Sequence, residues 1–253
     1  CSPYKLFKTK MYEGKYKQTE PLPREELREW GKRLEPVVAD YFAKISGYRL
    51  FSRGMMRDNY CTYRVANVDR LIANECAGVE CKTTSAYNKD AWSGNNYPMS
   101  YYYQCLHYML VMFCKADGRL MPEFEHCNVR WYLVCLIGGN HIEVREIQYN
   151  EDDAVELAKR EKAFFEAMQK DICPEVSDMD CDADYWKKQP STKFAPASLN
   201  RSCDEYADKL FGINAQLKAL KKEKQLCENY LCDQLANNAH GVSDRYYIDF
   251  RDV

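Results

Sequence analysis

Apolar and polar residues alternate along two neighbouring stretches of the chain. Residues 62–72 alternate in part and contain several β-branched side chains, and residues 79–84 resume a short strand pattern. Between them, residues 74–78 include turn-forming types. The sequence therefore predicts two adjacent strands that are separated by a turn.

Three helical patterns surround this pair of strands. The first begins near Pro23 and continues to Phe42, the second is strongly apolar and opens at residues 101–108, and the third runs from about Asp152 to Met168. The acids at the start of the third helix suit the positive end of a helix dipole. Helices are therefore expected on both sides of the strands.

A second strand pair follows the apolar helix. Residues 131–137 form a continuous apolar run, which ends at Gly138-Gly139-Asn140, and residues 142–148 alternate as a hairpin partner would. Because these strands are interspersed with helices, the sequence predicts an α/β fold that has a mixed sheet flanked by helices.

The C-terminal part has a different pattern. Between residues 204 and 235 apolar residues recur in alternating steps of four and three, with Lys224 as a polar break. These residues are Tyr206, Leu210, Ile213, Leu217, Leu220, Cys227 and Leu231. A helix of this length extends about 45–50 Å at 1.5 Å per residue. Two alternatives stay open, a helix that packs back on its own domain and a coiled-coil arm that self-associates or binds a partner.

Three parts of the chain follow from these patterns. Residues 1–170 form the expected α/β domain, and residues 171–202, which are rich in proline and polar side chains, predict a linker or peripheral loop. Residues 203–253 form the C-terminal extension, where the long helix is followed by a short terminal strand at residues 246–250.

Composition narrows the class of protein. In 253 residues, 46% are hydrophobic and 29% are charged, which is typical of a globular enzyme with one enlarged domain and an appendage. We find neither a membrane-spanning apolar run nor a secretory signal, so a cytoplasmic protein is expected. The net charge of -2 gives no overall basic surface, although residues 5–17 and 24–33 concentrate positive charge and leave room for a local basic channel.

The thirteen cysteines suggest neither disulfides nor a metal cluster. They are scattered, odd in number and without a Cys-x2-Cys pair, as expected for reduced thiols of a cytosolic protein. The spacing contains no tight trio of cysteines, with Cys173 and Cys181 eight apart and Cys227 and Cys232 five apart, so an iron–sulfur cluster is not expected. The four histidines are scattered as well, so zinc is not expected.

The spacing Asp69-x10-Glu80-Cys81-Lys82 is the feature with the clearest chemistry. Because side chains alternate along a strand, Glu80 and Lys82 should share one face while Cys81 points to the other. Two carboxylates on neighbouring strands can bind Mg²⁺, and the ammonium beside them can orient or deprotonate an attacking water. A solvated hairpin with a salt bridge is the plainer alternative for this pattern.

Two flanking segments add to this pattern. Glu35 lies on the first helix, on the face that also bears charge, and Gln104 and Tyr108 are four residues apart on one side of the apolar helix. A buried glutamine needs hydrogen-bond partners, and a phosphate-binding site would supply them. Tyr108 sits in an apolar run, so it is equally explained as a core aromatic.

Five ordered motifs bring these segments together. They are Trp-Gly-Lys-Arg-Leu-Glu-Pro at 30–36, Ala-Asn-Val-Asp-Arg-Leu-Ile at 66–72, Gly-Val-Glu-Cys-Lys-Thr at 78–83, the pair Gln104 and Tyr108, and Leu-Ile-Gly-Gly-Asn at 136–140. With these motifs the chain resembles, from about Cys1 to Lys170, the YqaJ-type viral recombinases, relatives of phage lambda exonuclease in the PD-(D/E)xK nuclease superfamily. The resemblance implies a restriction-endonuclease-like fold.

The resemblance also implies roles for individual residues. Asp69, Glu80 and Glu35 resemble the family's metal-binding acids, with the carbonyl of Cys81 also facing a metal. Lys82 resembles the catalytic lysine. Gln104 resembles the glutamine that positions water or the scissile phosphate, with Tyr108 as its supporting neighbour.

The function implied by the resemblance is a Mg²⁺-dependent exonuclease, in which Mn²⁺ can substitute. It would degrade linear double-stranded DNA from 5′ to 3′ and expose a strand for a RecT-like or Bet-like annealing protein, in the bacterial host of a phage or prophage. A homo-oligomer is implied, with a ring-shaped trimer as one form. An endonuclease of the same superfamily in repair or defence, and a non-catalytic DNA-end-binding scaffold, remain as alternatives.

One departure affects the DNA contacts. Relatives have an arginine and a Ser-Asp or Ser-Glu step before the segment that matches residues 1–5, and these help to hold the 5′ phosphate. The chain as given starts after that segment. The basic residues that remain as candidates for DNA binding, each equally explained as solvated surface, are Lys5, Lys8, Lys10, Arg53 and Arg57.

Overall fold

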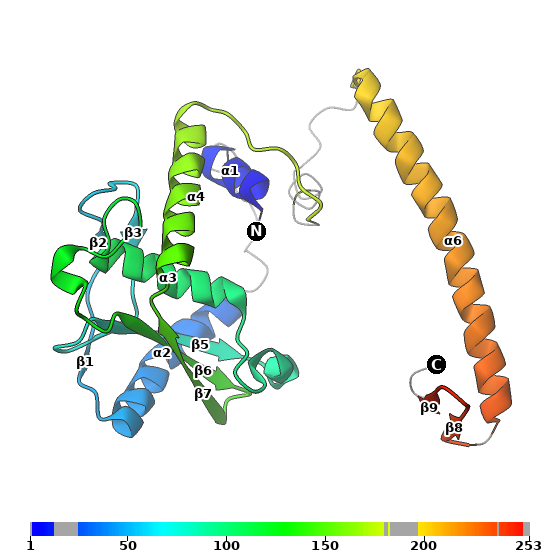
Figure 1. Ribbon diagram of the computed structural model, residues 1–253, viewed down its shortest axis with the longest axis horizontal. Coiled ribbons are helices and arrows are strands. Elements are labelled where there is room, and N and C mark those ends of the chain that lie inside the picture. Colours follow the sequence, from blue (N-terminus) through cyan, green and yellow to red (C-terminus); the bar gives the residue numbers. More distant parts are fainter. Residues whose placement is uncertain (1, 13–24, 180–181, 183–196, 237, 250–253) are drawn as a thin grey trace. The chain divides into compact units, whose positions relative to one another are not determined.

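The computed structural model describes residues 2–12, 25–179, 182, 197–236 and 238–249. They fall into two compact units, Cys1–Gln189 and Pro190–Val253. The N-terminal unit contains the main sheet, and the C-terminal unit contains one long helix followed by a small hairpin (Figure 1). Pro23, Cys181 and most of the expected linker, residues 183–196, lie outside the described residues.

The N-terminal unit alternates helices and strands. In chain order its elements are α1 (Pro3–Tyr12), α2 (Glu25–Ser46), β1 (Leu50–Phe51), β2 (Met56–Arg57), β3 (Val65–Ala66), β4 (Arg70–Ile72), β5 (Ala77–Thr84), the 3-10 helix η2 (Ala86–Trp92), α3 (Met99–Phe113), the 3-10 turn η3 (Pro122–Phe124), β6 (Arg130–Ile137), β7 (His141–Gln148) and α4 (Glu151–Gln169).

The main sheet has five strands in the order β1-β4-β5-β6-β7. Only β5 and β6 run parallel, with α3 in the connection between them, and the other neighbours are antiparallel. This arrangement follows the rule that a parallel pair needs a long crossover whereas a tight turn suffices for an antiparallel pair. The predicted mixed sheet flanked by helices is therefore confirmed.

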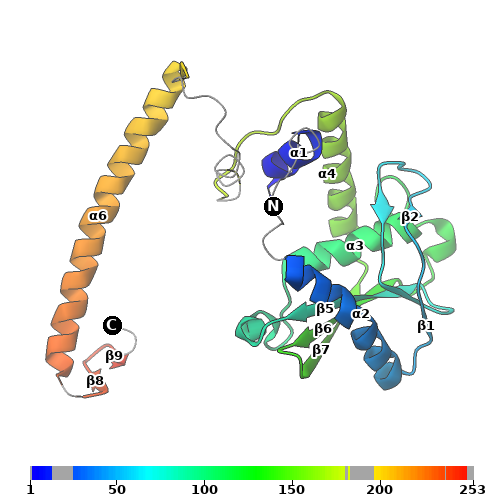
Figure 2. The same ribbon diagram turned by 180° about the vertical axis from the view of Figure 1, so that it is seen from behind.

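Both faces of the sheet are covered, and the two cores follow the alternation along β6. Tyr132 and Val134 face α2 together with Val38 and Phe42. Trp131, with Leu133 and Cys135, faces α3 in the larger core. Figures 1 and 2 show α2 and α3 on opposite sides of β5 and β6. Any polar residue of β5 therefore faces one of these two helices, which decides where a site can form.

The prediction of a single strand over residues 62–72 is wrong. The chain forms two short strands instead, and Asp69 occupies a bend just before β4. β3 pairs with β2 in a separate two-stranded sheet. The reason lies at Arg64, which is buried and donates hydrogen bonds to the carboxylates of Asp58 and Glu161. These bonds hold the segment before β4 against α4, away from the main sheet.

The C-terminal unit consists of α6 (Arg201–Leu235) and the hairpin of β8 (His240–Val242) with β9 (Tyr247–Asp249). Asn200 caps α6, because its side-chain oxygen accepts a hydrogen bond from the backbone N–H of Cys203. The predicted helix at 204–235 is confirmed, and it begins three residues earlier. The terminal strand is confirmed over Tyr247–Asp249, whereas Phe250 lies outside the described residues.

Membrane insertion finds no support in the part of the chain that the structure describes, since none of its helices is both long and apolar enough to cross a bilayer.

Candidate active site

The site lies at the open edge of β5. β4 pairs with β5 only through the partners Arg70–Val79 and Leu71–Gly78, so in the described sheet the later residues of β5 have no strand on that side. Asp69 takes the next place, where its Oδ2 accepts a hydrogen bond of 2.8 Å from the backbone N–H of Cys81. In a strand the N–H and C=O of one residue point to the same side, so the carbonyl of Cys81 also faces this edge.

Glu80, Lys82 and Gln104 form a hydrogen-bonded group between β5 and α3. Lys82 Nζ lies 2.5 Å from Glu80 Oε1 and 2.8 Å from Gln104 Oε1. The Nε2 of Gln104 donates to the same Glu80 oxygen at 2.8 Å. An ammonium group can only donate, which fixes the amide of Gln104 with its oxygen toward lysine. The expected shared face of Glu80 and Lys82 is confirmed.

Tyr108 extends the hydrogen-bonded group of Glu80, Lys82 and Gln104 toward the core. Its hydroxyl accepts a hydrogen bond of 2.6 Å from Gln104 Nε2, and its ring packs on Trp131 at 5.4 Å between centroids. Tyr108 is buried in the core that α3 forms with the sheet. Both explanations that the sequence left open therefore apply, since Tyr108 is a core aromatic whose hydroxyl also positions Gln104.

The second oxygen of Glu80 has no hydrogen-bond partner among the described residues. Glu80 is only 3% exposed, and its Oε2 is buried without a hydrogen bond. Burial of a carboxylate oxygen without a partner costs free energy, and a bound ligand would supply the missing partner. The carbonyl of Cys81 and the carboxylate of Asp69 face the same edge of the sheet, and this all-oxygen set matches what Mg²⁺ prefers.

The electrostatics of Asp69 agree with a site for a cation. Burial, followed by the nearby charge of Glu80, raises the pKa of Asp69 to about 7, although the hydrogen bond from Cys81 acts in the opposite direction. The charged form of Asp69, which the neighbouring carboxylate of Glu80 disfavours, is stabilised when a positive ion binds beside it.

Glu35 reaches the site from α2 but is held by another partner. Arg70 donates a hydrogen bond of 2.8 Å to Glu35 Oε1 and a second one to the backbone carbonyl of Asp69. In the part of the chain that the structure describes, no three His, Cys, Asp or Glu side chains gather closely enough to hold a metal ion. Participation of Glu35 in metal binding therefore requires that its side chain moves closer to Asp69 and Glu80.

Two further residues lie at the site that the sequence patterns do not single out. Arg70 follows Asp69 directly, and Tyr101 places its ring 4.8 Å from Lys82 Nζ in a cation–π contact. Tyr101 precedes Gln104 by three residues, so the helical spacing alone places both on one face of α3. No comparable signal marks Arg70, because its partner is 35 positions away in sequence.

The candidate DNA-binding residues are not gathered at the site. Lys5, Lys8 and Lys10 belong to α1, which packs beside α4 rather than beside β5 (Figure 1). Arg57 belongs to β2, in the small separate sheet, and Arg53 lies in the loop before it. Their role in DNA binding therefore stays a prediction.

Comparison with known proteins agrees with the motifs. Residues 1–115 match the model of the YqaJ-like viral recombinase domain. This match includes every proposed site residue and ends before residues 116–170, where the resemblance was also expected. Across 232 residues the chain is 28% identical to a Bacillus subtilis (strain 168) protein described as uncharacterized protein YqaJ, covering 88% of this chain and 68% of that protein.

Among solved structures, an alkaline exonuclease (LHK-Exo) from Laribacter hongkongensis is similar to part of the chain. The sequence identity is 15%, the TM-score is 0.48, and the similarity covers 57% of this chain and 70% of the other.

Proposed function

We propose, from the match of residues 1–115 to the YqaJ-like viral recombinase domain, that this chain is a nuclease of DNA recombination. In its specific form the proposal is a Mg²⁺-dependent exonuclease that degrades one strand of linear double-stranded DNA from 5′ to 3′. The exposed strand would pass to a RecT-like or Bet-like annealing protein in the cytoplasm of a bacterium that hosts the phage or prophage. The observation that supports it best is the contact of Lys82 with Glu80 and Gln104 beside Asp69.

The residues at the edge of β5 fit a divalent ion. Asp69, the free oxygen of Glu80 and the carbonyl of Cys81 would hold it, and Glu35 would join after its side chain moves closer to them. These are hard oxygen ligands, which suit Mg²⁺ and also Mn²⁺. Bound Mg²⁺ would polarise the scissile phosphate and favour deprotonation of an attacking water.

The remaining chemistry belongs to side chains of the chain itself. Lys82 is held by two acceptors, so its ammonium keeps a fixed position where it can stabilise the negative charge that grows in the transition state. Gln104 fixes both Glu80 and Lys82, and Tyr108 fixes Gln104 in turn. Asp69 must lose its proton before it can serve as a ligand, which links activity to neutral or alkaline pH.

Digestion of linear and circular duplex DNA of the same sequence tests the reaction class. With Mg²⁺ the proposal requires loss of linear DNA while covalently closed circles persist. Cutting of both substrates would instead identify an endonuclease, and cutting of neither would leave a scaffold that binds DNA ends. Chelation of the ion by EDTA serves as the control in each case.

End-labelled duplexes test the polarity separately. A substrate with a 5′ phosphate should be degraded faster than one with a 5′ hydroxyl, with mononucleotides released from the 5′ end, because a terminal phosphate held in a basic pocket positions the scissile bond. Equal rates, or release from the 3′ end, would reject the polarity and leave the nuclease proposal standing.

A further inference from the structure

Five apolar side chains form a continuous row along α6, which we call the α6 seam. They are Tyr206, Leu210, Ile213, Leu217 and Leu220. Each is between 48% and 72% exposed. Within the C-terminal unit the hairpin of β8 and β9 covers only the end of the helix, where Gly241 lies against the buried Leu235. The rest of the seam has no cover from the described residues of its own unit.

A helix with these properties needs a packing partner. Most helical stability in proteins comes from tertiary packing of an apolar face, and the apolar face of α6 is exposed. Gly212 lies inside α6, and no atoms lie within 4 Å of the place where its side chain would begin, so this glycine lowers helix stability without a compensating packing contact. Burial of the α6 seam against a partner would therefore add the packing stability that α6 lacks.

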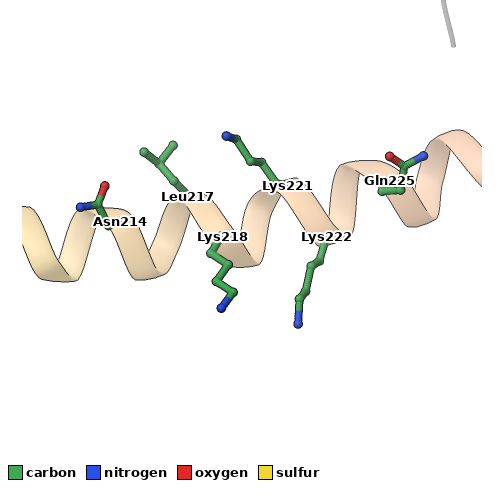
Figure 3. Close-up of a pocket in the computed structure, with 6 residues that line it drawn as sticks. All are labelled: Asn214, Leu217, Lys218, Lys221, Lys222 and Gln225. Atoms are coloured by element: carbon green, nitrogen blue, oxygen red, sulfur yellow. The ribbon is translucent and has the colours of Figure 1, made fainter.

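The charges of α6 leave the seam accessible to a second helix. Figure 3 shows Leu217 and Lys221 pointing to one side of α6, whereas Lys218 and Lys222 point to the opposite side. The shallow hollow in this region is lined by residues of α6 alone, so its side opposite α6 is open to solvent. A helix that covers Leu217 would lie between flanking side chains such as Lys221, which is the arrangement of a coiled coil.

We propose that α6 of a second copy of this chain covers the seam in an antiparallel coiled coil. The register places Leu210 opposite Leu220 of the second copy and Ile213 opposite Leu217 of the second copy. Each of these contacts occurs twice because the pair is symmetric. Four layers of leucine and isoleucine then form the centre of the interface, and the charged outer face of α6 stays in solvent.

Charge complementarity selects this orientation. In the antiparallel register Lys209 of each copy lies beside Glu223 of the other copy. Lys224 lies opposite Tyr206 of the other copy, where its ammonium group can reach solvent over the aromatic ring. A parallel pair in register would instead bring Lys224 against its own equivalent in the core and Glu223 beside Glu228. Like charges at these positions disfavour the parallel form.

Two cysteines of α6 report the orientation directly. Cys203 and Cys227 continue the spacing of the seam, and both are free thiols with solvent access. The antiparallel register places Cys203 opposite Cys227 of the second copy, whereas a parallel pair places each cysteine opposite itself. A disulfide forms only when the two Cα atoms lie within about 7 Å, so the observed linkage identifies the register.

Mild oxidation of the full chain with diamide, followed by digestion and mass spectrometry, tests the proposal. The expected product is a covalent dimer whose cross-linked peptide joins Cys203 to Cys227. Within one helix these residues are too far apart to react, about 36 Å at 1.5 Å per residue. Links of Cys203 to Cys203 and Cys227 to Cys227 would overturn the antiparallel orientation, and a chain that stays uncross-linked would overturn the pairing.

A charge swap gives an independent measurement on the full chain. Lys209→Glu and Glu223→Lys should each weaken association at least about tenfold and halve the mass found by light scattering at a dilute concentration, because attraction becomes repulsion at two symmetric places. The double variant should restore the wild-type mass. Lys218→Glu, on the opposite side of α6, is the matched control and should leave it unchanged. Single variants that keep the wild-type mass, or a double variant that fails to restore it, would refute the interface, and neither outcome depends on nuclease activity.

Discussion

Glu80 is the residue whose surroundings are hardest to explain without a ligand. One of its oxygens accepts hydrogen bonds from both Lys82 and Gln104, while the other is buried and has no partner in the described part of the chain. A residue kept only for structure would be expected to pair both oxygens, because an unpaired buried polar atom costs about 1–3 kcal/mol. The asymmetry fits a carboxylate that shares one oxygen with the protein and reserves the other for an ion.

The raised pKa of Asp69 leads to a prediction about the stability of the fold rather than about activity. Its raised pKa means that the folded state binds a proton more tightly than the unfolded state, so Asp69 lowers stability as the pH rises from about 4 to about 7. Asp69→Asn removes this penalty without much change in volume. Without metal the variant should melt on the order of 5 °C above the wild type at pH 8, and the difference should vanish near pH 4.

Thermal denaturation at the two pH values, with and without Mg²⁺, measures this effect. Addition of Mg²⁺ at pH 8 should raise the melting temperature of the wild type but leave the variant nearly unchanged, because the ion loses a ligand. A variant that is less stable than the wild type at pH 8 without metal would contradict the electrostatic description of the site.

The sequence predicts the main site residues because local periodicity determines their faces. Strand alternation was enough for Glu80 with Lys82, and helical spacing was enough for Gln104 with Tyr108. Arg70 and Glu35 come together only through packing of α2 on the sheet, which periodicity does not encode. The basic residues chosen by charge alone were not brought to the site, since surface charge contains no information about distance.

At the scale of elements, the approach of β5 to β6 depends on Gly78. A Cβ added there would lie 2.2 Å from the indole of Trp131, which is fully buried and cannot move aside. Gly78→Ala should therefore destabilise the protein by about 3 kcal/mol or more. Gly31→Ala is the matched control, because Gly31 lies in α2 with open space around it and should gain stability from higher helix propensity.

Urea denaturation of both variants measures the difference. Since Trp131 also supports Tyr108, Gly78→Ala should reduce catalysis at temperatures where the variant is still folded. A Gly78→Ala protein as stable as Gly31→Ala would show that the packing of β5 on β6 is not as tight as described.

A second element-scale feature is the position of His107 between three elements. Its Nδ1 lies 2.6 Å from the carboxylate of Glu161 on α4, and its Nε2 lies 3.0 Å from the carbonyl of Val65 on β3. Both neighbours are acceptors, so both ring nitrogens must donate and the imidazole is charged. Burial opposes the charge, but the bonds to Glu161 and Val65 outweigh it and raise the pKa of His107.

This histidine makes stability depend on pH in a defined direction. Because the pKa of His107 is raised in the folded state, charged His107 stabilises the fold fully below the ordinary histidine pKa of about 6.5. This stabilisation is lost as the pH rises through the folded-state pKa. The stability difference between wild type and His107→Gln should therefore shrink when the pH is raised from 6 to 9. His126→Gln, at an exposed position, serves as the control in the same denaturation series. A difference that grows with pH would contradict the charged state.

Long, strongly periodic elements are the ones that the sequence predicts well. The boundaries of β6, α4 and α6 differ from the predicted ones by at most three residues, because each element has a continuous apolar pattern of one period. The prediction of one strand over residues 62–72 is wrong. There the buried Arg64 pairs with the nearby Asp58 and with Glu161, which is 97 positions away in sequence, and these ion pairs override the local alternation.

At the scale of the whole molecule, the proposed chemistry and the proposed association belong to different units. Every proposed site residue precedes Lys115, and the α6 seam begins after Cys203. Removal of residues 203–253 should therefore leave single-turnover cleavage of linear DNA measurable while it lowers the mass of the assembly. Size-exclusion chromatography with light scattering gives the mass. An unfolded truncated protein would show that the C-terminal unit completes the N-terminal core instead.

The rate of nucleotide release from linear duplex DNA with Mg²⁺ tests the central claim, that Asp69 and Glu80 form a metal-dependent nuclease site. Asp69→Asn and Glu80→Gln change charge with little change in volume, and loss of a metal ligand should remove several kcal/mol of transition-state stabilisation. We predict that each variant stays folded and releases nucleotides at least about a hundredfold more slowly than the wild type. Retention of more than about a tenth of the wild-type rate by both variants would contradict the assignment of the site.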